Sequence, residues 1–404
     1  MRRARRWMVG VLVAAFGASF GVPVAGAVLT PDWQRSAGIE LESVAWDGDE
    51  VVVVGSVDLP NVRFPALLVR KYDALGNVVW TETWHPQGTR VNGFDVTVDA
   101  DGAIYVVGDV ARANLEGGGY FLRKYGPSGE LRWRRVSEGG YVDGPDIPEI
   151  ATGVSAFGRH VIVVGHRYGC CGSAADDGWI RSFEPNGSER WTRNFEVPDV
   201  DRRTNDVALE VDTDARGAYV VGHVETARRT DLSVRVDTEL VAQKVSFTGE
   251  RLWTFMLRDR DVRDSDQGTD IAVRAGVYVV GDVNGRRFSH GEGFAARITR
   301  EGRLGWRRIW GEPADGIAPS GVDVTVSGDP LVVGTIADPD DATLDVFLRL
   351  IDADGSLNEQ VIDDRARSLA ATAVAVDEAN AAYVSGWLEL ADATHGGRLW
   401  RWTT

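Results

Sequence analysis

The sequence predicts an all-β fold, a seven-bladed β-propeller built from four-stranded antiparallel blades. Three observations support this prediction: two marks that repeat along the chain at a near-constant period, and the absence of a convincing amphipathic helical pattern. Each repeat contains four short runs rich in Val, Tyr, Phe and Trp, separated by turns such as Asp-Gly or Ser-Gly. Four strands per unit of this length are typical of propeller blades, whose closure into a ring hides most sheet edges.

The first mark is a hydrophobic run that ends in Gly, as in the YVVG sequence. It ends at Gly55, Gly108, Gly165, Gly222, Gly281, Gly334 and Gly386. Seven marks at so regular a spacing indicate seven copies of one structural unit.

The second mark is a Gly that closes a turn and is followed four residues later by Trp. The glycines are Gly76, Gly129, Gly187, Gly249, Gly302 and Gly355, and the first five are followed by Trp80, Trp133, Trp191, Trp253 and Trp306. Glu359 replaces the sixth Trp. A fixed spacing predicts a turn of fixed length, with Gly supplying the positive φ, and then an outer strand with its aromatic at a packing position between blades.

In the second unit we expect strands at about 95–99, 104–108, 119–125 and 131–135. The blades then take residues 37–86, 87–140, 141–198, 199–260, 261–314, 315–365 and 366–404. The last unit contains only three runs, whereas an isolated Asp32-Trp33-Gln34-Arg35 precedes the first and matches the outer run around Trp133. We therefore expect residues 28–36 to complete blade seven and to close the ring.

Residues 1–27 have the features of a secretory signal peptide. Four arginines precede an apolar stretch interrupted by Gly and Ser, and Ala25-Gly26-Ala27 forms a cleavage signal. We expect an exported protein, periplasmic, cell-surface or extracellular, that does not span a membrane. Removal of this segment moves the formal net charge from −16 to −20. Nucleic acid is therefore a poor partner, and we expect a monomer that binds a protein, a glycan or a small molecule.

The repeats resemble the bacterial secreted β-propeller repeat family, in which a YVxG strand is followed by a run such as DAFVAKLDPDGNLLW. The likeness is carried by YVVG, by GYFLRKYGPSGELRW in the second unit and by DVFLRLIDADGSLN in the sixth. It covers essentially the whole chain after the signal peptide. The resemblance implies a propeller fold and implies no particular activity, because propellers carry unrelated functions.

The connections within blades differ between the two faces of the predicted ring. First-to-second and third-to-fourth connections are tight, whereas second-to-third and blade-to-blade connections are long and variable, which predicts one trimmed face and one loop face. The loop-face connections are acidic, with Asp143, Asp146, Asp199, Asp201, Asp259, Asp261, Asp264, Asp266, Asp338, Asp340 and Asp341. The simplest interpretation is a solvated acidic surface, and the stretch 264–270 only weakly resembles a calcium loop.

Two rings of candidate site residues follow from the repeat. An early position on the innermost strand is occupied by Ser43, Asp95, Gly153, Ala208, Asp270, Asp323 and Ala373. Asp95, Asp270 and Asp323 are candidate ligands for a metal, with calcium the ion considered; the alternative is that they accept hydrogen bonds from main-chain amides.

The second ring follows the YVVG-type strands and contains Ser56, Asp109, His166, His223, Asp282, Thr335 and Trp387. Asp109, His166, His223 and Asp282 fall on consecutive blades and have side chains suited to ligand binding or acid–base chemistry. At an expected separation of roughly 10 Å, two strand spacings, they could line a pocket but could not share one zinc ion without further ligands. A repeated third-strand arginine, at Arg70, Arg123, Arg181 and Arg349, predicts stacking on a neighbouring aromatic.

Three functions are compatible with these features. The first is an exported non-enzymatic binding protein that uses the loop face, favoured because no complete catalytic motif is present. The second is an oxidoreductase that resembles quinone-dependent dehydrogenases, exported propellers of which some carry a vicinal cysteine pair beside the quinone. Cys170 and Cys171 are adjacent, and either a vicinal disulfide or two thiols remain open for them. The third is a metal-dependent hydrolase or lactonase that uses the three channel aspartates.

Overall fold

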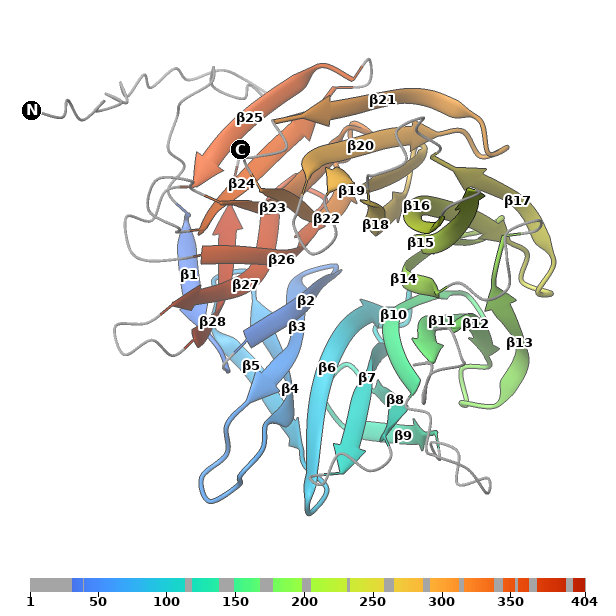
Figure 1. The fold of residues 1–404 in the computed structure, drawn as a ribbon. Coiled ribbons are helices and arrows are strands. Elements are labelled where there is room, and N and C mark those ends of the chain that lie inside the picture. Colours follow the sequence, from blue (N-terminus) through green and yellow to red (C-terminus); the bar gives the residue numbers. More distant parts are fainter. Residues whose placement is uncertain are drawn as a thin grey trace, which may run out of the picture.

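The computed structural model describes residues 31–38, 40–112, 118–137, 149–167, 177–197, 205–230, 233–257, 265–285, 291–311, 316–337, 344–352, 355–362, 369–389 and 395–403. These residues form a ring of seven four-stranded antiparallel blades, and the predicted fold class is confirmed (Figure 1). Within the described part of the chain, no helix has the length and apolar character needed to cross a membrane.

The strands follow one another from the channel outward in each blade. Blades one to three contain β2 (Glu40–Asp47), β3 (Glu50–Val57), β4 (Ala66–Asp73) and β5 (Val78–Trp84); β6 (Thr89–Val98), β7 (Ile104–Arg112), β8 (Gly118–Tyr125) and β9 (Leu131–Val136); and β10 (Glu149–Phe157), β11 (His160–Arg167), β12 (Asp177–Phe183) and β13 (Glu189–Phe195). Blades four and five contain β14 (Asp206–Asp214), β15 (Gly217–Thr230), β16 (Ser233–Val245) and β17 (Arg251–Met256); and β18 (Ser265–Val273), β19 (Val277–Gly285), β20 (Glu292–Ile298) and β21 (Leu304–Trp310). Blade six contains β22 (Ile317–Val324), β23 (Pro330–Ala337), β24 (Leu344–Ile351) and β25 (Leu357–Ile362).

Blade seven joins the two ends of the described chain. Its inner strands are β26 (Leu369–Val376), β27 (Ala382–Glu389) and β28 (His395–Trp402), and its outer strand is β1 (Trp33–Ser36). Strand β1 pairs antiparallel with β28, with Trp33 opposite Arg401 and Ser36 opposite Arg398. The ring therefore closes through an N-terminal strand, as the repeat predicted.

A β-bulge on every innermost strand explains the Gly that ends each YVVG-type run. In blade two the register shifts between Gly93 and Asp95, opposite Gly108. A Cβ at Gly108 would overlap the carbonyl oxygen of Asn92, so only Gly allows the two backbones to approach. The same overlap with a carbonyl oxygen of the paired strand would occur at the corresponding glycines of the other six blades.

The Gly-to-Trp spacing builds a latch between neighbouring blades. Trp80 of blade one donates from Nε1 to the carbonyl oxygen of Pro127 in the β8–β9 turn of blade two, at 3.1 Å. Gly129 of that turn lies against the indole, where a Cβ would meet Cδ2 at 2.8 Å. Equivalent bonds join Trp133 to Pro185, Trp191 to Phe247 and Trp253 to Arg300.

The latch bond forms at four of the five tryptophans, since Trp306 Nε1 has no hydrogen-bond partner. The absence of a Trp in the sixth unit coincides with the absence of such a turn in blade seven. The residue at that position is Glu359 on β25, the outer strand of blade six, and the next blade in the ring is blade seven. The third and fourth strands of blade seven come from opposite ends of the described chain. No turn joins β28 to β1, so blade seven offers no turn carbonyl to an indole from blade six.

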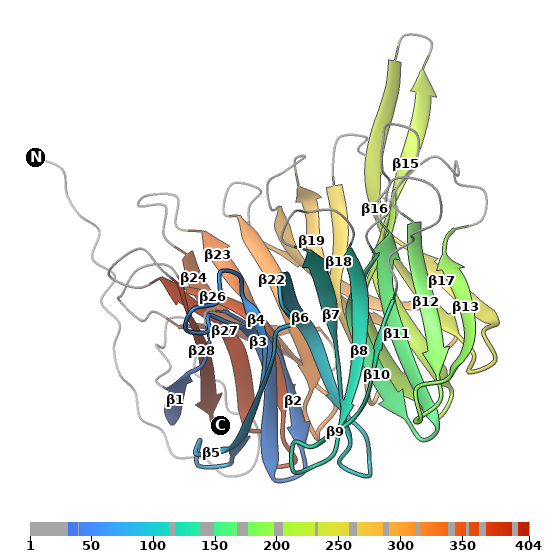
Figure 2. The same ribbon diagram turned by 90° about the horizontal axis from the view of Figure 1, so that it is seen from below.

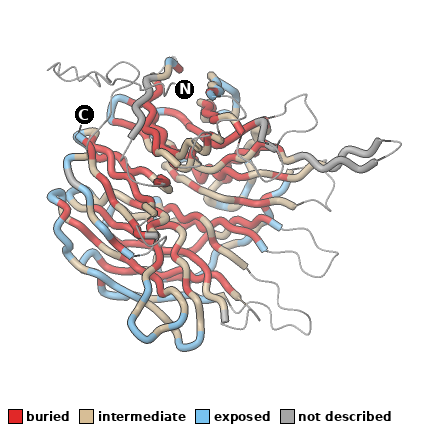
Figure 3. Tube along the Cα trace, turned by 60° about the vertical axis from the view of Figure 1, so that its left-hand side comes forward, coloured by how far each residue is buried: buried red, intermediate tan, exposed pale blue. Residues whose placement is uncertain are grey.

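The core is divided among the interfaces between blades. The described residues form seven hydrophobic clusters, and each contains side chains of two successive blades, including the pair formed by blades seven and one. Buried positions accordingly follow the inner strands, whereas much of the outer strands is exposed (Figure 3). Packing face to face around a ring lets short, Val-rich strands bury both sides of each sheet.

One hairpin extends well beyond the other blades. Strands β15 and β16 are 14 and 13 residues long and remain paired from Ala218 opposite Val245 to Thr230 opposite Ser233. Figure 2 shows this hairpin projecting from the face that carries the second-to-third connections. Among the described residues, this hairpin of blade four is the longest one on the loop face.

Candidate functional site

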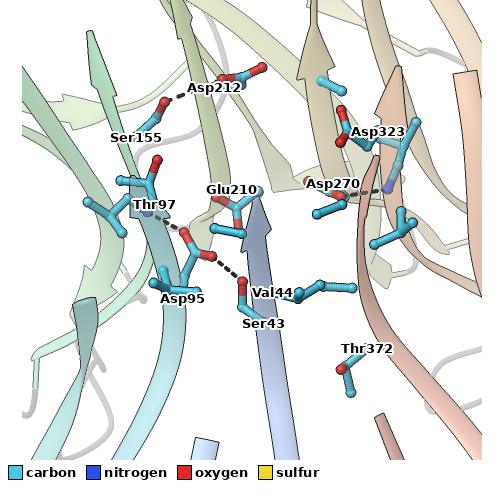
Figure 4. A pocket seen from close by; sticks show the side chains of 18 of the residues that line it. Ser43, Val44, Asp95, Thr97, Ser155, Glu210, Asp212, Asp270, Asp323 and Thr372 are labelled. Carbon is cyan, nitrogen blue, oxygen red and sulfur yellow. Dashed lines mark hydrogen bonds between the residues drawn. The ribbon is translucent and has the colours of Figure 1, made fainter. Parts of the chain in front are cut away.

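The centre of the ring encloses a cavity of about 310 Å³, lined by residues of all seven innermost strands. Its acidic lining residues are Glu42, Asp95, Glu210, Asp212, Asp270 and Asp323. No Lys, Arg or His is among the described residues that line it. The side chains come together from blades that are far apart in the sequence (Figure 4).

The bulges change which inner-strand residues are equivalent. One position of the innermost strand pairs with the residue that precedes the YVVG-type glycine on the second strand. In blades one to seven it is occupied by Ser43, Asp95, Gly153, Glu210, Asp270, Gly321 and Ala373. The predicted alignment was therefore wrong in blades four and six, where it placed Ala208 and Asp323. The turn between the first and second strands varies in length from blade to blade. An alignment of inner-strand residues that counts back from the YVVG-type glycine is therefore off by two residues in these two blades.

Because of this misalignment, two acidic residues of the channel were not predicted. Glu210 occupies the position predicted for Ala208, and Asp212 follows two residues later, level with Asp323 of blade six. A signal was present, because side chains two residues apart on a strand point to the same face. Glu210 and Asp212 therefore had to share a face of the innermost strand.

Four channel aspartates tie their blade to the next one through the main chain. Asp95 Oδ2 accepts a hydrogen bond from the Val154 amide at 2.7 Å, which joins blade two to blade three. The corresponding acceptor–donor pairs are Asp212 with Val273, Asp270 with Val322 and Asp323 with Val376, at 2.6–2.7 Å. The predicted alternative, hydrogen bonds to main-chain amides, is what the structure shows.

The residues at the equivalent positions of the following blades are small. Asp95 and Asp270 are each followed, one blade on, by a Gly at the equivalent position, Gly153 and Gly321. Asp212 and Asp323 are followed in the same way by alanines, Ala272 and Ala375. In these four cases the acid on one inner strand is followed by a small residue at the same level of the next inner strand.

The three aspartates predicted to hold one ion do not converge as expected. Asp323 lies two residues further along its strand than Asp95 and Asp270, and all three carboxylates accept main-chain amides. Among the described residues, no group of three or more His, Cys, Asp and Glu side chains is arranged to hold a metal. Calcium binding therefore stays a prediction, and the described residues provide no set of ligands for it.

Burial shifts the acidity of the whole channel. Burial, opposed by hydrogen bonds from neighbouring amides, raises the pKa of Asp95, Asp212 and Asp323 to about 6. Burial and the charges of Asp95 and Asp212 raise the pKa of Asp270 to about 8. Burial and nearby Asp95 and Asp270 place the pKa of Glu210 well above its usual range, and burial with Glu40 raises that of Glu42 to about 7.

The second predicted ring is distributed over separate crevices. Side chains alternate along each second strand, so Asp109 shares the face of Tyr105 and Val107, which pack against blade three. By the same alternation His166 faces blade four, His223 faces blade five and Asp282 faces blade six. The sheet of one blade separates each residue from the next, so these four do not line a common pocket.

The members of this ring have local surroundings of their own. Asp109 accepts hydrogen bonds from Asn92 at 2.8 Å and from Arg90 at 3.4 Å, and burial raises its pKa. Burial lowers the pKa of His223 to about 4, and nearby His166 acts in the same direction. His223 is therefore neutral at physiological pH.

The repeated arginines stack as predicted. The guanidinium carbon of Arg123 lies 4.4 Å from the ring centroid of Trp84, and that of Arg349 lies 4.6 Å from that of Trp310. Arg181 lies 4.3 Å from the ring of Trp179 and also pairs with Glu149. Arg70 differs, because its Nε donates to Thr81. These arginines support the blades.

Several predicted features lie outside the described residues. They are Cys170, Cys171, Asp143, Asp146, Asp199, Asp201, Asp259, Asp261, Asp264, Asp338, Asp340 and Asp341. The cysteine pair on which the oxidoreductase hypothesis depends thus has no described geometry. Of the acidic loop residues, Asp266 is described, and it is buried.

Replacing Asp212 by Ala is expected to lower the free energy of unfolding by about 3 kcal/mol, because the amides of Thr213 and Val273 both lose their acceptor. Asp212→Asn keeps one acceptor oxygen and should cost less. Urea unfolding measures both, with Asp101→Ala in an exposed turn as the control. An Ala variant as stable as the parent would show that these hydrogen bonds contribute nothing.

The comparisons with known proteins concern the fold. No protein-family model and no curated protein matches the chain. A solved structure of Raptor from Chaetomium thermophilum is 7% identical with a TM-score of 0.50, over 91% of this chain and 28% of that one. A sialidase from Trypanosoma rangeli is 10% identical with a TM-score of 0.47, over 81% of this chain and 56% of that one. An α-L-arabinofuranosidase from Fusarium graminearum is 10% identical with a TM-score of 0.46, covering 89% of this chain and 93% of that one.

These similarities carry no activity to this chain. The chain spans about half the length of the sialidase and less than a third of Raptor. At such low identity the Raptor match supports the fold alone, and the other two are too distant to support an argument. The comparisons therefore agree with a β-propeller fold and indicate no function for this chain.

Proposed function

We propose that this chain is an exported, non-enzymatic binding protein that contacts its ligand through the loop face of the propeller. The observation that carries the proposal is the use of the channel carboxylates. Asp95, Asp212, Asp270 and Asp323 accept amide hydrogen bonds from the following blade, which is a structural role. The loop face, with the projecting β15–β16 hairpin, is then the surface available to a partner.

The proposal includes the resemblance in the repeat. We infer that the chain belongs with the secreted bacterial propeller-repeat proteins whose YVxG motif it shares, and that residues 1–27 direct its export. A rigid ring with variable connections on one face suits recognition, because the scaffold holds the loops without taking part in binding.

Shortening the hairpin is the sharpest test of this function. Glu225 and Thr238 are directly paired, so replacing residues 226–237 with Asn-Gly joins them by a two-residue turn and keeps the register. Both proteins, immobilised through a C-terminal tag, are incubated with an array of microbial and plant glycans and with a cell-envelope protein extract. We expect the parent to retain a glycan or protein that the shortened variant loses, with unchanged thermal stability.

Two outcomes would contradict the proposal. One is an identical set of bound molecules for both proteins. The other is turnover: reduction of a dye by the chain supplied with quinone and calcium, or hydrolysis of lactones or glycosides, would identify an enzyme.

A further inference from the structure

One of the repeated third-strand arginines lies opposite a like charge. In three blades the residue that pairs with this arginine on the outer strand is uncharged or acidic, in the pairs Arg70–Thr81, Arg181–Thr192 and Arg349–Glu359. In blade two, Arg123 of β8 pairs with Arg134 of β9. Like charges directly opposite one another on a sheet destabilise it. Blade two therefore holds a pair of cations that the other three blades lack.

Trp84 of blade one lies beside both guanidinium groups. The guanidinium carbon of Arg123 is 4.4 Å from the ring centroid of Trp84, and that of Arg134 is 6.0 Å from it. Trp84 ends β5, so the two arginines lie where the outer strands β5 and β9 of blades one and two meet (Figure 1). Arg123 is 4% exposed, whereas Arg134 is exposed. A ligand would therefore approach the pair from the side of Arg134.

The buried guanidinium group of Arg123 has incomplete hydrogen bonding. Its Nε donates to the Tyr125 hydroxyl at 2.7 Å, and its Nη1 is buried with no hydrogen-bond partner. Among the described residues, no carboxylate forms an ion pair with Arg123 or Arg134, and Glu82, the acid of β5, is exposed. A buried cation without a counter-charge is costly, and stacking on Trp84 offsets only part of the cost.

Blade three shows a carboxylate at the equivalent arginine. Arg181 pairs with Val163, two residues before the YVVG-type glycine of its blade, as Arg123 pairs with Val106. Arg181 donates to both carboxylate oxygens of Glu149, from Nη2 to Oε1 at 2.9 Å and from Nη1 to Oε2 at 3.3 Å. The same position of the repeat thus binds a carboxylate within this molecule.

Blade two lacks the acid that blade three supplies. Glu149 lies two residues before Ala151, which pairs with Gly165, and the corresponding residue of blade two is Val91. Val91 is fully buried and carries no charge. Blade two therefore keeps the arginine and adds a second one, but leaves the carboxylate to come from outside the blade.

We propose that Arg123 and Arg134 form a binding site for the carboxylate of an organic acid, on the outer wall between blades one and two and beside Trp84. The carboxylate accepts charge-assisted hydrogen bonds from the two guanidinium groups, as Glu149 does from Arg181. Its charge removes the repulsion between the arginines. The site lies on the outer strands, apart from the loop face, and is independent of the function proposed there.

A titration followed at Trp84 tests the site directly. The chain that begins at residue 28 is titrated with propionate, galacturonate, galactose and chloride, the last as the control for ionic strength. The indole N–H resonance of Trp84, identified by its loss in Trp84→Phe, is followed by nuclear magnetic resonance. We expect saturable shifts with both carboxylates and none with galactose or chloride. Tighter binding of galacturonate would assign the ligand to the acidic sugars, and equal binding would assign it to simple organic acids.

A matched pair of variants ties the binding to the two arginines. Arg134→Gln removes the exposed charge and is expected to weaken carboxylate binding at least about tenfold, because a charge-assisted hydrogen bond is lost. Arg132→Gln is the control, since Arg132 is an exposed arginine of the same strand that pairs with Glu130. It should bind like the parent. Equal binding by Arg134→Gln and the parent, or equal shifts with chloride and propionate, would overturn the proposal.

Arg134→Glu supplies the acid from within the chain, at the position where blade six places Glu359 opposite Arg349. We expect the midpoint of urea unfolding to be higher for this variant than for the parent. Propionate should raise the midpoint of the parent and leave that of Arg134→Glu unchanged. A variant less stable than the parent, or one that propionate still stabilises, would contradict the site.

Discussion

Removing residues 32–36 is expected to open the ring and to lower the free energy of unfolding by on the order of 4 kcal/mol or more. The deletion removes β1, so β28 becomes an unpaired edge. It also removes the 2.8 Å ion pair of Asp32 with Arg401 and the hydrogen bond from Arg35 Nε to the Gly76 carbonyl oxygen of blade one.

Urea unfolding of the chain that begins at residue 28 gives the reference, and a variant lacking only residues 28–31 is the control. A synthetic peptide of residues 28–37 added to the deleted chain should restore part of the stability, because it can pair with β28. An unfolding midpoint that does not change on deletion would show that blade seven is stable with three strands.

Gly108→Ala is expected to lower the free energy of unfolding by about 3 kcal/mol. The added Cβ would overlap the carbonyl oxygen of Asn92 and would lie 2.8 Å from the ring of Phe121. Neither the bulged strand nor the buried ring can move away without disturbing the interface with blade one. Thermal and urea unfolding both measure the loss.

Gly118→Ala is the matched control, since it adds the same methyl group to β8 of the same blade. There a Cβ would meet its nearest neighbour, Ala111 Cβ, at 3.5 Å, an ordinary contact. We expect this variant to remain within about 1 kcal/mol of the parent or to gain slightly. Equal effects at the two glycines would contradict the role assigned to the bulge.

The repeat made most of the fold predictable. The YVVG-type glycines and the Gly-to-Trp spacing are requirements of backbone contact and of a latch between blades, so they recur wherever the blade recurs. The match of Trp33 with Trp133 predicted ring closure, because an outer strand without its blade needs a partner elsewhere. The exception at Glu359 coincides with the absence of a third-to-fourth turn in blade seven.

The site was less predictable, because it depends on register and on neighbours in the next blade. Each bulge adds a residue and each first turn has its own length, so Asp323 was aligned two residues from its true equivalent, Gly321. Ring positions that look adjacent in the repeat, such as His166 and His223, face different crevices. The Glu210 side chain lies against the inner strand of blade three, and Gly153 is the residue there that makes room for it.

The amides that donate to the channel aspartates report directly on the ties between blades. Hydrogen exchange of the Val376 amide, measured in the parent and in Asp323→Ala, reports whether the carboxylate ties blade six to blade seven. We predict at least about tenfold faster exchange at Val376 in the variant, with no change at Val332, which lies within blade six. Unchanged protection of Val376, or protection that appears only with added calcium, would contradict the claim that these carboxylates are ties between blades.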